Sequence, residues 1–313
     1  MAIVFVHRGY SPYMEFTLRQ ARAADPEAEV LLLGDPENDR FAFVTHVDTT
    51  AAPYASAAAE LGAAYRHLST NRVAFERFCF ERWFVLQAAM RARGLDRALV
   101  LDTDVLLYAT EAEVVASHVG ERPVGIGIPE VQEPFVWVGA PHASYWTRGA
   151  VDAFCAFVLD AYRHGDAFDR KWAYHRENAI AGGVCDMTAL YLFARSLDPE
   201  GLANPISIRD GAVFDHNLNV ADNEHPLEFE MEGRYKWVGW RDGRPVGRTR
   251  SGELVRWLGL HLQGQAKARV PGLYRGPAFP GQRRLSWQLA LHFAARRLAS
   301  QARTRLKRVR PAA

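Results

Sequence analysis

Two aspartates, Asp102 and Asp104, interrupt an apolar run in RALVLDTDVLLYAT, residues 97–110. Such a run predicts a strand buried on both faces, and two residues that are two positions apart in a strand lie on the same side. Neighbouring carboxylates repel each other unless a cation lies between them, and Mg²⁺ or Mn²⁺ prefers oxygen ligands. Because Mg²⁺ is typically held by one or two carboxylates and substrate phosphates, the stretch predicts a metal–diphosphate site. A solvated aspartate pair that caps a turn is the alternative.

A second group of residues lies far downstream, in LHLQGQAKAR, residues 260–269. His261, Gly264 and Lys267 form an HxxGxxK pattern just after a strand-like stretch. An imidazole can be a third metal ligand, a glycine lets the backbone approach a phosphate, and a lysine adds a point charge. The pattern alone is weak. Together with the upstream aspartates it predicts that both groups serve one metal–diphosphate.

The surrounding elements predict an α/β protein. A strand over 2–6, a helix opened by Ser11-Pro12 and a strand over 29–33 form a βαβ unit, which implies a parallel sheet. Ligands of open parallel sheets bind at the carboxyl ends of the strands, where the aspartates would lie. The other expected elements are helices over 57–65, 75–93, 111–119, 151–164, 187–197 and 285–308, strands over 98–107 and 124–128, and β-ribbons after about residue 206 that turn at 242–243 and 251–252.

With these motifs, the chain resembles glycosyltransferases of the GT-A fold, and its motif layout is most similar to glycosyltransferase family 8 and related bacterial sugar transferases. The resemblance covers roughly residues 1–270 and rests on the βαβ unit, RWFVLQAAMRARGLDRALVLDTDV, GGVCDMTALYLF and HLQGQAK. It implies a Rossmann-like nucleotide-diphospho-sugar transferase fold with a mixed, mostly parallel sheet. It also implies that Asp102, Asp104 and His261 hold Mn²⁺ or Mg²⁺, and that Gly264 and Lys267 contact the donor phosphates.

Further donor contacts follow from the resemblance. The family's donor-binding arginine precedes the aspartates on a helix; Arg82 is the nearest match and Arg77 an alternative. The family's Asp-Gln-Asp segment is reduced here to Cys185-Asp186-Met187, which makes Asp186 the candidate carboxylate beside the transferred sugar.

Other polar and aromatic residues have two interpretations each. His7, Arg8, Gly9 and Tyr10 follow the first strand, and Gly34 and Asp35 follow the second, where a nucleotide would lie. The loop FDHNLN, residues 214–219, fits ligand binding or turn formation equally. Sugar stacking or core packing would explain the aromatic residues Trp137, Tyr145 and Trp146.

Composition limits the class of protein. The chain has 313 residues, of which 49% are hydrophobic. Its three cysteines lack CxxC spacing, so we expect no disulfide framework and a cytoplasmic protein. The N-terminal apolar stretch is too short for a signal peptide, and no apolar run of about 18 residues suggests a spanning helix. We expect a glycosyltransferase domain over 1–270, with a nucleotide-binding part (1–130) and an acceptor-side part (131–270), and a basic amphipathic extension over 271–313.

The charge is unevenly distributed. Residues 254–313 contain 13 Lys or Arg and no acid, which leaves 25 basic and 36 acidic residues in the rest. A basic amphipathic helix fits an anionic membrane surface, here the inner face of the membrane, although packing on its own domain explains the pattern equally well. Nucleic acid is not an expected partner, because the body is acidic and no recognition motif is present.

The sequence therefore predicts a metal-dependent glycosyltransferase that moves a sugar from a nucleotide-diphosphate donor, UDP more than others, to a hydroxyl of a glycan or glycolipid. A haloacid-dehalogenase-like phosphohydrolase with Asp102 as nucleophile is the second interpretation. A nucleotidyltransferase would need a Gly-rich, basic loop after the first strand, and HRGYSPY does not provide one. A non-catalytic protein of the same fold is the third alternative.

Overall fold

The computed structural model describes residues 2–129 and 135–309, with side chains up to residue 299. Its centre is a seven-stranded sheet in the order β3-β2-β1-β4-β7-β6-β8. Pairing is parallel between β1 and β2, β2 and β3, β1 and β4, and β6 and β8, and antiparallel where β7 meets β4 and β6. The predicted mixed, mostly parallel sheet is therefore confirmed. The strands are β1 (Ala2–His7), β2 (Glu29–Gly34), β3 (Thr45–Asp48), β4 (Arg97–Leu101), β6 (Val124–Gly127), β7 (Ala140–Thr147) and β8 (Leu202–Ala203).

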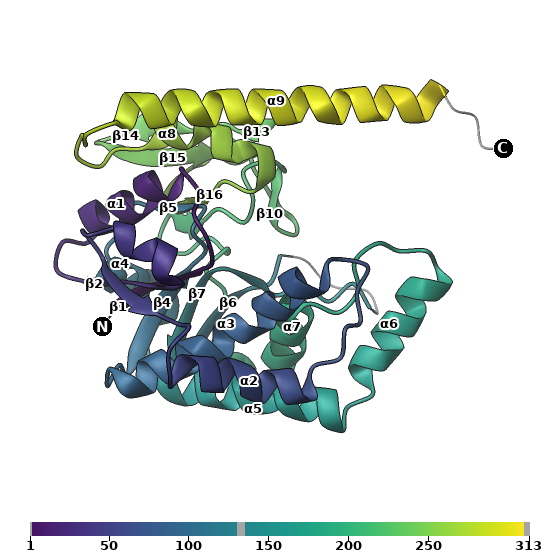
Figure 1. Cartoon of the computed structure of the whole chain (residues 1–313). Helices are drawn as coiled ribbons and strands as arrows, with labels where there is room; N and C mark the ends of the chain where they lie inside the picture. The colour runs from purple at the N-terminus through teal and green to yellow at the C-terminus, as the bar shows by residue number, and fades with distance from the viewer. Residues whose placement is uncertain (1, 130–134, 310–313) are drawn as a thin grey trace.

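Both faces of this sheet are covered, as the apolar strands require (Figure 1). Ala2 and Val4 of β1 share one core with residues of α2, α3, α5 and α7, whereas Ile3 and Phe5 share the opposite core with residues of α1. Successive residues of a strand point to opposite faces, and here both faces are buried. The helices are α1 (Met14–Ala24), α2 (Tyr54–Ala64), α3 (Val73–Ala92), α4 (Glu111–Val114), α5 (Arg148–Arg163), α6 (Ala167–Glu177) and α7 (Asp186–Ser196), with the short helix η2 (Val115–Val119) after α4.

A second sheet joins strands from the C-terminal part of the chain to β5, the strand that follows β4. Its strands run in the order β14-β15-β16-β5, and β9 pairs with β16 beside this path. The turn at Asp242–Gly243 joins β14 and β15, as predicted, and both turn residues have positive φ. The bounds are β5 (Val105–Leu107), β9 (Ala212–Phe214), β14 (Gly239–Arg241), β15 (Arg244–Arg248) and β16 (Leu254–His261), with two small ribbons formed by β10 (Asp222–Glu224) and β11 (Leu227–Glu228), and by β12 (Met231–Glu232) and β13 (Tyr235–Lys236).

Two sequence predictions about local structure are wrong. The expected strand over 98–107 is broken, because β4 belongs to the first sheet and β5 to the second, with a turn at residues 102–104 between them. The first helix begins at Met14 rather than at Ser11-Pro12; the preceding residues form a turn in which the Met14 N–H donates to the Ser11 carbonyl at 3.0 Å.

The terminal helix α9 (Gln282–Val309) lies across one end of the molecule in Figure 1 and packs against η4 (Gly264–Arg269). The short α8 (Val270–Leu273) connects these elements. Among the residues the structure describes, no helix is long and apolar enough to span a bilayer.

Candidate functional site

The turn at residues 102–104 is fixed from three sides. The Asp102 N–H donates to the His142 carbonyl of β7 at 2.9 Å, and the Leu262 N–H donates to the Asp104 carbonyl at 2.9 Å. From α1, the Thr17 hydroxyl donates to the Thr103 carbonyl at 2.7 Å. Both aspartate side chains are therefore held at the carboxyl end of β4, the edge where the sequence placed them, although a turn rather than strand alternation brings them together.

Asp102, Asp104 and His261 each offer one ligand atom, and these atoms lie within 4.8 Å of one another. His261 ends β16, whose residues Gly259–His261 pair with β5 directly after Asp104. Its Nδ1 lies 2.7 Å from the His216 carbonyl, and because a carbonyl only accepts, Nδ1 carries the proton. In the neutral ring Nε2 is then the nitrogen that can bind a metal, and it faces Asp104 Oδ1 at 3.6 Å. Two carboxylates and a neutral imidazole fit a divalent cation such as Mn²⁺ or Mg²⁺.

Two cations already pair with the aspartates. Lys267 Nζ lies 2.5 Å from Asp104 Oδ2, and Arg82 donates to Asp102 Oδ1 at 2.7 Å. Arg82, from α3, also forms an ion pair with Asp186, the first residue of α7, to which the Trp83 indole donates at 3.2 Å. Arg82 thus joins two predicted carboxylates. The alternative, Arg77, instead pairs with Glu81 on its own helix.

These contacts move the pKa values of the two aspartates apart. Burial raises the pKa of both carboxyls. For Asp104, Lys267, together with His261 whenever that ring is protonated, outweighs burial and lowers the pKa below its ordinary value. For Asp102, burial prevails over Arg82, and the nearby Asp104 raises the pKa further. A divalent cation between them would relieve this repulsion.

Of the residues predicted to contact nucleotide, His7 lies beside the aspartates, whereas Gly9 contacts Asp35 at the end of β2. His7, at the end of β1, is hydrogen-bonded through Nδ1 to the Thr103 hydroxyl at 3.0 Å, and burial lowers the pKa of His7 to about 4. Gly9 has a φ of 73°, which favours glycine, and its N–H donates to Asp35 Oδ2 at 2.7 Å. Gly264, also at positive φ, begins the η4 helix that carries Lys267.

The aromatic residues show which interpretation holds. Tyr145 and Trp146 are buried on β7 in the two cores, so sugar stacking is wrong for both. Trp137 is half-buried next to Phe135, with ring centroids 5.0 Å apart. Sequence reasoning missed His142, whose ring stacks on His261 with centroids 4.2 Å apart and an interplanar angle of 5°. Only the antiparallel register of β7 on β4 could have revealed it.

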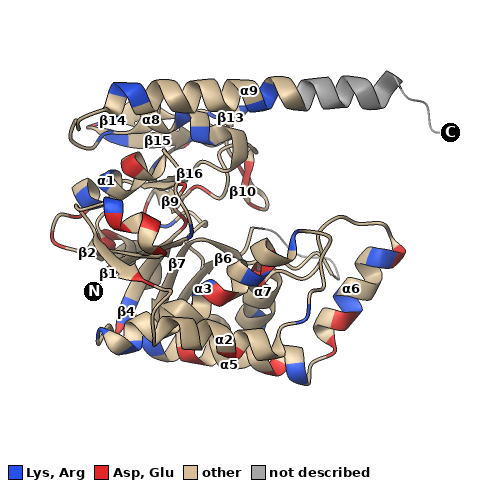
Figure 2. Ribbon diagram, viewed as in Figure 1, with Lys and Arg blue, Asp and Glu red and all other residues tan. Residues whose placement is uncertain are grey.

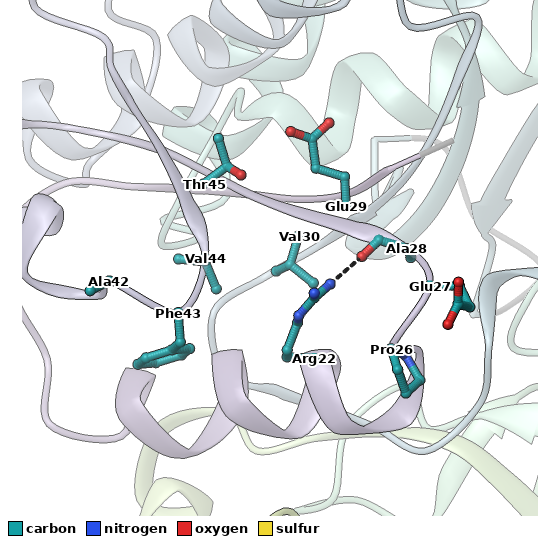
Figure 3. Close-up of a pocket in the computed structure, with 10 residues that line it drawn as sticks. All are labelled: Arg22, Pro26, Glu27, Ala28, Glu29, Val30, Ala42, Phe43, Val44 and Thr45. Atoms are coloured by element: carbon teal, nitrogen blue, oxygen red, sulfur yellow. Dashed lines mark hydrogen bonds between the residues drawn. The ribbon is translucent and has the colours of Figure 1, made fainter.

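A pocket of about 430 Å³ lies elsewhere, between the end of α1 and the amino ends of β2 and β3 (Figure 3). Arg22 crosses it and donates to the Ala28 carbonyl at 2.7 Å. The aspartates lie at the carboxyl end of β4, the opposite edge of the sheet, and none of the lining residues belongs to the candidate site.

No protein-family model matches the chain, and no curated protein matches its sequence. Its fold is similar to solved structures of glycosyltransferases. Mouse xyloside xylosyltransferase 1 in its apo form is 11% identical over 65% of this chain and 84% of that one, with a TM-score of 0.42. An active-site mutant of LgtC is 15% identical over 93% and 95%, with a TM-score of 0.40, and the PaToxG glycosyltransferase is 12% identical over 64% and 72%, also at 0.40. These likenesses are distant, so the function is argued from the site.

Proposed function

We propose that the chain is a metal-dependent glycosyltransferase that moves a sugar from a nucleotide-diphosphate donor, with UDP as the first candidate, to a hydroxyl of a glycan or glycolipid. The observation that carries the proposal is one cluster at the sheet edge: three ligand atoms within 4.8 Å, with Lys267 and Arg82 paired to the two aspartates. A dication together with Lys267 and Arg82 would outweigh the carboxylates of Asp102, Asp104 and Asp186, and the remaining positive charge would attract a diphosphate.

Each residue has a distinct part in this proposal. Asp102, Asp104 and His261 would hold Mn²⁺ or Mg²⁺, which when bound neutralises charge that develops on the leaving diphosphate. Lys267 would bind a phosphate oxygen, and the backbone at Gly264 would approach the phosphates. Arg82 would orient the donor between Asp102 and Asp186. Asp186 would face the transferred sugar, and His7 and Gly9 would contact the nucleoside.

The phosphohydrolase alternative is disfavoured by the same contacts. Cleavage of a phosphate ester needs a proton donor for the leaving oxygen. Asp104 is a poor donor because the Lys267 ammonium group beside it favours its ionised form and helps to hold its pKa below the ordinary value. Arg82 also occupies Asp102, the required nucleophile. Phosphatase activity that Asp102→Asn abolishes would restore this alternative.

Thermal unfolding tests the transferase proposal directly. The chain is melted with UDP, GDP, CMP and ADP in turn, each with and without Mn²⁺. A ligand that binds only the native state at 100 times its Kd adds about 2.7 kcal/mol to stability. We expect UDP to stabilise only with Mn²⁺, and Asp104→Ala to remove the effect. If no nucleotide shifts the melt with any metal, the proposal fails.

We also propose that the chain binds an anionic bilayer through α9. The helix has two apolar faces: Leu289 and Phe293 are buried on the body, whereas Trp287, Leu291 and Leu298 are 64–71% exposed. The charged side chains on its described part are all basic (Figure 2). These cations would repel a second copy of the helix and attract anionic lipid, at about 1 kcal/mol for each basic residue near the surface.

Vesicle co-sedimentation tests this partner. We expect binding to phosphatidylglycerol vesicles but not to phosphatidylcholine vesicles, and loss of binding in Trp287→Ser/Leu291→Ser. Binding of the wild type and the variant to the same extent, or dimerisation without lipid binding, would refute the proposal.

A further inference from the structure

Asp215 and Lys236 form an ion pair that is fully buried behind the candidate site. Lys236 Nζ lies 2.7 Å from Asp215 Oδ1, and neither side chain is exposed to solvent. Asp215 follows β9, and Lys236 ends the small ribbon of β12 and β13. A buried ion pair is weak evidence for stability, because desolvation of both charges offsets their attraction. Its other contacts therefore become informative.

The second oxygen of Asp215 accepts the backbone N–H of His261 at 3.1 Å. The Asp215 carbonyl lies 2.9 Å from Nε2 of His142, the ring that stacks on His261. The next carbonyl, that of His216, accepts Nδ1–H of His261, and the Leu218 N–H donates to the His261 carbonyl at 3.1 Å. Residues 215–218 thus hydrogen-bond to the backbone N–H, the backbone carbonyl and Nδ1 of His261, and His142 covers one face of its ring.

Asn223 fixes this segment in turn. Its Oδ1 accepts from Lys236 Nζ at 2.8 Å and from the His216 N–H at 2.7 Å. Its Nδ2 donates to the carbonyls of Ile206 at 2.7 Å and Phe214 at 2.9 Å. Lys236 therefore binds Asp215, which directly precedes His216, and Asn223, which accepts the His216 N–H. His216 in turn provides the carbonyl that orients the His261 ring.

We propose that Asp215 and Lys236 are positioning residues that set the orientation of His261 as a metal ligand. The proposal rests on the metal site of the proposed function. Groups that orient a ligating histidine typically affect metal affinity by about 10- to 100-fold when they are changed. In this proposal the polar residues of FDHNLN support the metal-binding His261 and do not contact the substrate.

The double variant Asp215→Asn/Lys236→Met separates positioning from stability, because it removes both buried charges together and keeps the side-chain volumes similar. Such replacements are often neutral for stability. Mn²⁺ is titrated into the chain, alone and with UDP, and free Mn²⁺ is followed by electron paramagnetic resonance. We expect a melting temperature close to that of the wild type and a Kd for Mn²⁺ raised about 10- to 100-fold.

A matched control is Val255→Ala, a buried residue on the same strand as His261. It should lower the melting temperature and leave the Kd for Mn²⁺ unchanged. If the double variant does not fold, Asp215→Asn/Lys236→Gln tests the same role. Both groups stay polar inside the buried cluster, but the shorter, neutral Gln side chain loses the ion pair, so Mn²⁺ binding should still weaken.

The two proposals fail differently. Wild-type affinity for Mn²⁺ in either folded double variant overturns the positioning role alone. A wild-type chain that binds no Mn²⁺, with or without UDP, overturns the metal site and the positioning role together.

Discussion

Replacing Lys267 by methionine should change two affinities in opposite directions. In the ligand-free chain Lys267 pairs with Asp104, so a metal must compete with an ammonium group for that carboxylate. In the donor complex the same ammonium group would bind a phosphate. Lys267→Met should therefore tighten the binding of Mn²⁺ alone and weaken the binding of UDP in the presence of Mn²⁺.

The magnitudes follow from the burial of the pair. The side chains of Lys267 and Asp104 are only 18% and 13% exposed, so solvent screens their attraction weakly. An opposite charge at this range typically lowers a carboxyl pKa by about 1–3 units, and one unit is worth about 1.4 kcal/mol. Loss of the lower value predicts Mn²⁺ binding about 10-fold tighter. A hydrogen bond to a charged group contributes about 1.5–3 kcal/mol, so UDP should bind about 10- to 100-fold more weakly.

Calorimetric titration of Mn²⁺, and then of UDP at saturating Mn²⁺, measures both constants. Arg77→Met is the control, because it removes a cation that pairs with Glu81 outside the site. Weakening of both ligands by Lys267→Met would refute the reasoning, since Lys267 would then support the site without competing with the metal.

Three further outcomes are expected from buried groups. Burial lowers the pKa of Lys171 to about 8, so unfolding takes up a proton between about pH 8 and 10.5. The free energy of unfolding should therefore rise with pH in that window, by up to about 3 kcal/mol. Urea unfolding at pH 7.5 and 9.5 should show this rise, and Lys171→Met should abolish it. Gly183→Ala would place Cβ 2.3 Å from the Leu68 carbonyl oxygen, so the free energy of unfolding in urea should fall by about 1–3 kcal/mol, whereas Gly149→Ala, with open space around it, should not lower it. Arg82→Met leaves two carboxylates without their cation and should cost about 3–5 kcal/mol in a metal-free melt, part of which Mn²⁺ restores; a melt that Mn²⁺ leaves unchanged would contradict this.

The sequence predicts which residues lie together where the signal is local. Asp102 and Asp104 follow β4 and His261 ends β16, and the structure brings these three side chains together; their roles remain predictions. The break between β4 and β5 was not predictable, because the residues on both sides of Asp102 and Asp104 are equally apolar.

The supporting residues depend on long-range register instead. His142 reaches His261 only because β7 inserts antiparallel beside β4, and an eight-residue strand with a proline near its start gives no such pairing signal. Asp215 and Lys236 look like ordinary loop charges until the fold removes both from water. Tyr145 was open to a surface role for the same reason, since its burial is decided by the helices that cover the sheet.

The break between β4 and β5 has a consequence for the time course of metal binding. Asp102 follows the last strand residue of the first sheet, whereas Asp104 directly precedes β5 and His261 ends β16, both in the second sheet. A cation on these three residues would join the two sheets. Any fluctuation that parts β5 from β4 would separate the ligands and release the ion. The residence time of the metal would then report how rarely the two sheets open.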